Sequence, residues 1–90
     1  MLVLPSELTH RQASACLRML VQGLPSQTGP AVQVDAASLK NFDSSALAVL
    51  LEFRRASVAL GKQFEIRGLS PRLVDLARLY GVDALLLPAA

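Results

Sequence analysis

Residues 31–61 read AVQVDAASLKNFDSSALAVLLEFRRASVALG, and the order of patterns within them decides the fold class. The segment Ala31–Asp35 alternates apolar and polar side chains, which predicts a strand with its two valines on one face. A polar stretch from Ala37 to Asp43 follows and predicts a loop. From Ser44 to Gly61 the apolar residues recur with helical spacing, and the glycine predicts the end of the helix. This strand–loop–helix unit indicates an α/β fold.

The sequence before this unit predicts a short strand and a first helix. The strand, Leu2–Leu4, ends at Pro5. Thr9 and Gln12 match a capping box, in which Thr9 covers a helix amide and Gln12 reaches back. Gly23 is the predicted C-terminal cap. The apolar residues of this helix share one face, which consists of Ala13, Cys16, Leu17, Leu20 and Leu24.

The sequence after the unit predicts one more strand, a third helix and a last strand. Phe64–Arg67 alternates and is the predicted strand. Ser70 and Pro71 are typical of a helix N-cap and its first residue, and Gly81 is typical of its end. The apolar segment Ala84–Leu87 predicts the last strand. The face that the third helix is expected to bury consists of Leu73, Leu76, Ala77 and Tyr80.

The expected fold class is therefore α/β, with a small, mainly parallel four-stranded sheet and helices in β-α-β-α-β-α-β order. We expect one domain over residues 1–90, because no linker or repeat divides the chain. Apolar residues make up 52% and charged residues 18%, a composition that excludes a highly charged disordered segment.

Charge and hydropathy limit the possible partners. Nine Lys and Arg residues against seven acidic ones give a net charge of +2, and the longest basic run is Arg54-Arg55, so we expect no nucleic-acid partner. The longest apolar run covers residues 46–51, whereas a span needs roughly 18 residues. Contact with a membrane is therefore expected only through a partner. A single cysteine, Cys16, excludes an intrachain disulfide.

Catalytic chemistry lacks its usual components. One histidine, His10, and one cysteine cannot assemble a zinc site. Ser44 and Ser45 lack a nucleophile-elbow motif and an identifiable base, and the five glycines are too scattered for a phosphate loop. We expect no catalytic residue, no metal and no cofactor.

The helix from Ser44 to Gly61 is apolar on two sides. Its first stripe, expected to face the sheet, consists of Ala46, Val49, Leu50, Phe53, Ser57 and Leu60. The second set is Leu47, Leu51 and Val58, bordered by Ser44 and Arg55. Packing against a neighbouring helix explains this second set, and so does a surface that binds another protein. The two explanations are compatible if Leu47 points inward while Leu51 and Val58 contact a partner.

Asp43, Ser44 and Ser45 precede or begin this helix. Ordinary helix capping accounts for Asp and Ser at these positions. The alternative is a hydroxyl that a partner recognises. A phosphate on Ser44 would lie at the positive end of the helix dipole, and at an interface its charge would oppose docking against an acidic or apolar surface.

The motif Asp43-Ser44-Ser45-Ala46-Leu47 after the strand ending at Asp35 resembles the STAS family, the sulfate-transporter and anti-sigma-antagonist fold. The family motif is Asp-Ser-Ser-Gly-Leu, and its first hydroxyl residue is phosphorylated or contacts the partner. The segment 69–82 resembles MlaB-like members more specifically. Ala46 departs from the family glycine and is expected to add a Cβ beside the hydroxyl, altering access by a kinase. Ser6-Glu7-Leu8-Thr9 departs from Gly-Glu-Leu-Asp, and an antiparallel strand that usually comes first is not apparent.

The resemblance implies a non-catalytic cytoplasmic adaptor that binds the ATPase subunit of an ABC phospholipid transporter, in a complex with its permease. The transporter would maintain outer-membrane lipid asymmetry, and the adaptor would lie peripherally at the inner membrane. The alternative is an anti-sigma-factor antagonist that phosphorylation of Ser44 regulates. Without its partner, the exposed helix face could self-associate weakly. The residues expected to contact the partner are Asp43, Ser44, Ser45, Leu47, Leu51, Arg55 and Val58.

Overall fold

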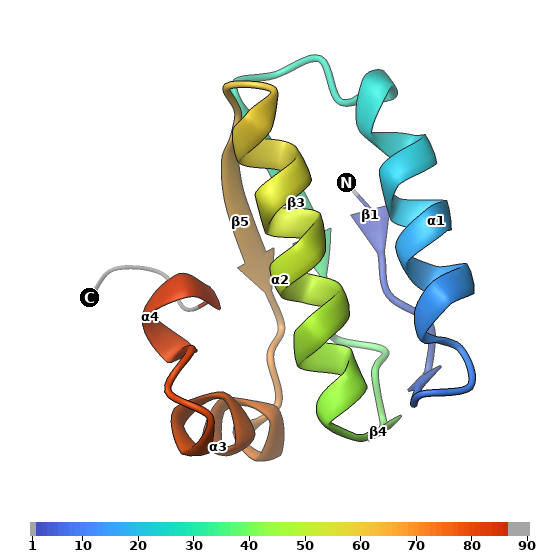
Figure 1. Cartoon of the computed structure of the whole chain (residues 1–90), viewed down its shortest axis with the longest axis vertical. Helices are drawn as coiled ribbons and strands as arrows, with labels where there is room; N and C mark the ends of the chain where they lie inside the picture. Colours follow the sequence, from blue (N-terminus) through green and yellow to red (C-terminus); the bar gives the residue numbers. More distant parts are fainter. Residues whose placement is uncertain (1, 87–90) are drawn as a thin grey trace.

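The computed structural model describes residues 2–86 (Figure 1). Short strands alternate with helices along the chain, as the patterns predict, and the α/β class is confirmed. The elements are β1 (Leu2–Val3), β2 (Glu7–Leu8), α1 (Ala13–Gly23), a 3-10 turn η1 (Leu24–Ser26), β3 (Ala31–Asp35), β4 (Asn41–Phe42), α2 (Ser44–Ala59), β5 (Gln63–Arg67), α3 (Pro71–Leu79) and α4 (Asp83–Leu86).

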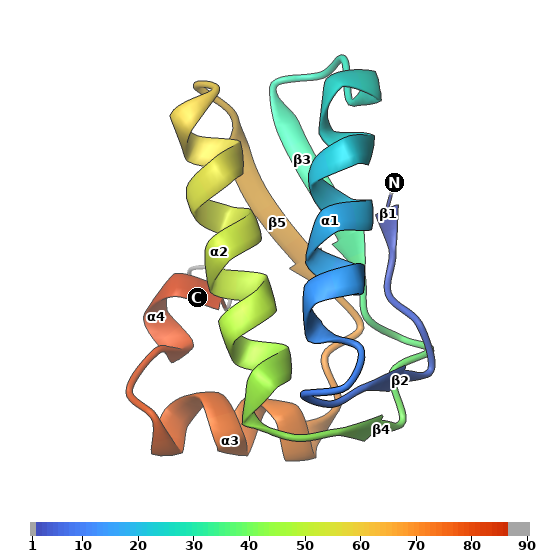
Figure 2. The same ribbon diagram turned by 45° about the vertical axis from the view of Figure 1, so that its right-hand side comes forward.

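The central sheet is parallel and has the strand order β1-β3-β5. In its register Val34 of β3 lies between Leu2 of β1 and Ile66 of β5. Figure 2 shows α1 and α2 side by side in front of this sheet. The other face is mainly polar, and there the Gln33 amide donates a hydrogen bond to the Glu65 carboxylate at 3.0 Å. The domain therefore has two layers, although parallel sheets usually carry helices on both faces.

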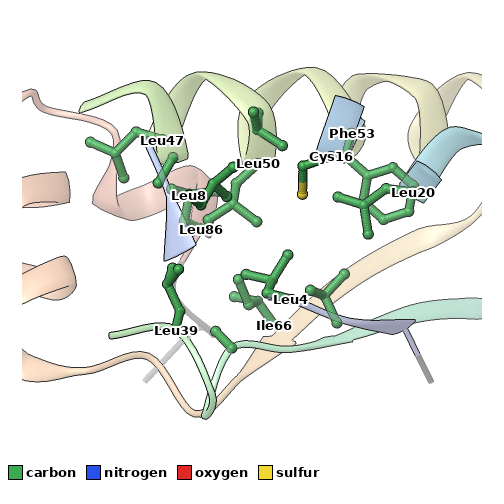
Figure 3. Close-up of a cluster of buried hydrophobic side chains, with 14 of the residues drawn as sticks. Leu4, Leu8, Cys16, Leu20, Leu39, Leu47, Leu50, Phe53, Ile66 and Leu86 are labelled. Atoms are coloured by element: carbon green, nitrogen blue, oxygen red, sulfur yellow. The ribbon is translucent and has the colours of Figure 1, made fainter. Parts of the chain in front are cut away.

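The core lies between the sheet and the two long helices. Phe53 and Leu50 of α2 are fully buried and point toward the strands (Figure 3). The Phe53 ring meets Phe64 of β5 edge to face, with centroids 6.1 Å apart. Ser57 is also fully buried, and its hydroxyl donates to the Phe53 carbonyl at 2.9 Å, so no polar group is stranded there.

The end of α2 differs from its predicted face. Ala46, Val49, Leu50, Phe53 and Ser57 are buried as predicted, but Leu60 is 59% exposed. Leu60 is the C-cap of α2 and has left the helical backbone conformation, so the helical periodicity no longer applies to it.

The start and end of α1 also differ from the prediction. The helix begins at Ala13, after a turn in which Gln12 Oε1 accepts a hydrogen bond from the Thr9 amide at 2.9 Å. That half of the capping box is confirmed, but Thr9 is not the N-cap. Gly23 is still helical and is not the cap. A Cβ there would lie 2.9 Å from Leu2 Cδ2, the end of a flexible side chain that can move aside at little cost.

Two expectations about strands were wrong. The predicted loop contains β4, which pairs with β2 in a separate two-stranded parallel ribbon; strands of two residues carry no alternation to detect. The segment expected to be the last strand forms the helical turn α4, while Leu87 lies outside the described residues. Within α4 Leu86 is buried and Leu85 is 46% exposed. A four-residue apolar run does not distinguish a strand from a helical turn, and the described central sheet has three strands rather than four.

The helix α3 lies crosswise at the N-terminal end of α2 (Figure 1). Gly68 makes this turn after β5, with φ of +76°, a value that favours glycine. Ser70 then caps α3, because its hydroxyl accepts from the Leu73 amide at 3.2 Å. The direction of α3 therefore depends on the backbone at Gly68.

We predict that Gly68→Ala destabilises the domain more than Gly61→Ala. Both glycines have φ of +76°, so alanine at either one costs roughly 1 kcal/mol of backbone strain. Only at Gly68 would the new Cβ also meet backbone, 2.9 Å from the Ala37 nitrogen. Chemical denaturation of both variants measures the difference. Equal losses in free energy of unfolding would show that the backbone at Ala37 moves away from the new Cβ without cost.

Candidate functional site

The Asp43 carboxylate organises the N-terminus of α2. Its Oδ1 accepts a hydrogen bond from the Ser45 amide at 2.8 Å, which makes Asp43 the N-cap. Its Oδ2 accepts from the His10 amide at 3.1 Å. One side chain thus joins the turn before α1 to the start of α2. The capping explanation for Asp43 is confirmed.

These hydrogen bonds hold the pKa of Asp43 below the ordinary aspartate range. The Ser45 amide has the largest effect, partial desolvation opposes it, and the His10 amide lowers the pKa further. The His10 imidazole Nδ1 lies 3.6 Å from Asp43 Oδ2, but the His10 side chain is 77% exposed and the Asp43 side chain 42% exposed. A pair in that setting adds little to stability.

Ser44 is exposed and borders two hollows. The first, here called the α3 cleft, lies between the start of α2 and α3 and has a volume of about 460 Å³. Arg72 forms one wall, with its guanidinium 5.2 Å from the centre of the Phe42 ring, and Asp75 lies on the same helix. The cleft is lined by Phe42, Asp43, Ser44, Arg72, Asp75, Leu76, Leu79 and Tyr80.

The second hollow, here called the α4 groove, lies between α2 and the link from α3 to α4. Its volume is about 280 Å³, and none of its lining residues is charged. Ser44 and Ala48 are its exposed small residues on α2. The other lining residues are Leu47, Leu51, Tyr80 and Val82. Because Ser44 and Tyr80 line both hollows, they lie at the boundary between the α3 cleft and the α4 groove.

The three residues of the second apolar set on α2, Leu47, Leu51 and Val58, have different environments in the structure. Leu47 is buried with 4% of its surface exposed, and Leu51 is half-buried, so both contribute to packing as well as to the groove. Val58 is 50% exposed but does not line the groove. Arg55 is exposed and pairs with Glu52 at 3.6 Å, as residues three apart on a helix surface do.

The structure bears on two expectations about the motif Asp43–Leu47, the partner contact of Ser45 and the position of the Ala46 Cβ. The Ser45 amide is occupied by the cap, and its side chain is half-buried. Ala46 is fully buried, whereas Ser44 is exposed on the outer side of the same helix. The expectation that the Ala46 Cβ lies beside the Ser44 hydroxyl was therefore wrong, because the Ala46 methyl group is buried in the core.

Sequence reasoning missed the wall opposite α2. Tyr80 was expected on the buried face of α3 but is 58% exposed, and the preceding Leu79 is 80% exposed. Tyr80 is the C-cap of α3, where the helix ends, and Gly81 follows with φ of +73°. A large aromatic residue immediately before a helix-ending glycine was the available signal. Ala48 carried no such signal, because a single exposed alanine on a helix forms no distinctive pattern.

Among residues 2–86 no three His, Cys, Asp or Glu side chains gather in a way that could hold a metal ion. No helix in the same range is long and apolar enough to cross a membrane. The site consists of two adjoining hollows with largely apolar walls and the exposed hydroxyl of Ser44.

Comparison with protein families gives a match that covers nearly the whole chain. A family model described as "Mlab, STAS domain" matches residues 1–88. The chain belongs to the Mlab STAS-domain family. The resemblance that the motif at Asp43–Leu47 indicates is thereby confirmed. No curated protein matches the chain. Ser44, which the motif resemblance assigns to the family's hydroxyl position, lies at the boundary of the two hollows.

We predict that Asp43→Asn flattens the acid dependence of stability. A carboxylate whose pKa is lowered by folding stabilises the protein above its unfolded value, about 3.9, and this contribution is lost as the pH falls through the lowered value. Asparagine keeps an acceptor for the cap but does not titrate. Thermal unfolding of both proteins between about pH 2 and pH 6 tests this. Parallel curves of melting temperature against pH would contradict it.

Proposed function

We propose that this STAS domain is a non-catalytic adaptor that binds the ATPase subunit of an ABC phospholipid transporter and supports its assembly or activity. The transporter maintains outer-membrane lipid asymmetry, and the adaptor lies on the cytoplasmic side of the inner membrane, attached through the ATPase and its permease. Membership of the Mlab family supports this proposal. The α4 groove is the structural feature that supports it best.

The α4 groove is suited to a protein partner. Its walls combine half-buried Leu51 with exposed Tyr80, and no charged residue lines it. Contiguous exposed apolar surface often marks a protein-binding site, and aromatic residues are enriched at interfaces. An apolar side chain from the ATPase would fill the groove and cover the Tyr80 ring.

The residues expected at the interface then take different roles. Ser44, Leu51 and Tyr80 form its centre, and Leu47 supports them from below. Arg55 and Val58 lie further along α2 and form a rim, where contacts contribute less to affinity. Asp43 and Ser45 act by fixing the start of α2, because the Asp43 carboxylate and the Ser45 amide bind each other.

A second candidate is an anti-sigma-factor antagonist that phosphorylation of Ser44 regulates. The observation that favours it is the exposure of Ser44 at the N-terminus of α2, with Arg72 lining the same cleft. A helix N-terminus and a guanidinium both accommodate phosphate. The added charge would oppose the docking of an apolar partner surface in the adjoining groove.

The function is tested by identifying what the full chain binds in its native cell. We predict that the tagged protein, purified from native membrane extract in mild detergent, carries an ABC ATPase and its permease, which mass spectrometry identifies. An extract from cells that express the tag alone is the control. Recovery of a serine kinase or an anti-sigma factor, without the ATPase, would overturn the adaptor proposal in favour of the second candidate.

We predict that Ala48→Glu weakens ATPase binding about tenfold or more, whereas Ala59→Glu, beside the Arg55 and Val58 rim, weakens it far less. Both alanines are exposed on α2, but only Ala48 lines the groove. The glutamate carboxylate at position 48 would lose its hydrating water when a partner covers this surface, and that desolvation costs binding free energy. Titration of each variant against the co-purified ATPase gives the affinities, and circular dichroism confirms the fold. Equal affinities would place the interface elsewhere.

We predict that Tyr80→Ala raises the Kd for the ATPase about tenfold, the effect of losing an interface residue that contributes about 1.4 kcal/mol. The side chain is 58% exposed, so its removal changes the melting temperature little. Leu60→Ala, at a residue 59% exposed but outside both hollows, is the matched control. Leu51→Asp is expected to weaken binding as well, but it also disturbs core packing, which makes Tyr80 the cleaner test. A Tyr80 variant that binds like the Leu60 variant would contradict the prediction.

A further inference from the structure

We draw no further inference here: the strongest candidate, the α3 cleft between the start of α2 and α3, carries charges of both signs on Arg72 and Asp75, adjoins the site already described, and has nothing among residues 2–86 to show what covers it.

Discussion

Burial of Leu50 and Phe53 against the sheet fixes how α2 is rotated about its own axis, and the candidate site depends on that rotation. With these residues inside, the outer side of the helix must carry Ser44 and Ala48, because residues four apart share a face. A slip of one position would turn the helix by about 100° and replace this small-residue surface with a different set. The packing that stabilises the domain and the hollows beside α2 therefore share one cause.

Two local devices then define the ends of the site. Asp43 binds the amides of Ser45 and His10, which anchors the first turn of α2 to the segment before α1. Gly68 turns the chain from β5 into α3, so that α3 crosses the end of α2 and supplies Tyr80 as the facing wall. Neither device contacts the groove itself. They act on the position of the elements instead, since Asp43 anchors the first turn of α2 and Gly68 sets where α3 begins.

The sequence predicted those elements that show a repeated apolar spacing or a helix-capping motif. The long helices and the five-residue strand β3 show repeated apolar spacing, and the Asp-Ser-Ser motif marks the start of α2 at its observed position. The failures occur where an element is too short for a period, as in β2, β4 and α4, or where a helix ends, as at Leu60 and Tyr80. The α4 groove was not predictable for another reason: it needs the crossing of α3 over α2, which no local pattern encodes.

The exposure of Ser44 connects the two functions considered. Because the Ser44 hydroxyl is small, a partner protein can approach closely at the boundary of the two hollows. A phosphate on Ser44 would lie between the two proteins at the same place. The substitution of alanine for glycine at position 46 does not separate these functions, because Ala46 is fully buried in the core. The distinction must therefore come from what lies opposite the groove. Apolar walls without charge favour a stable docked subunit, because a lasting interface gains from every desolvated apolar side chain that it covers.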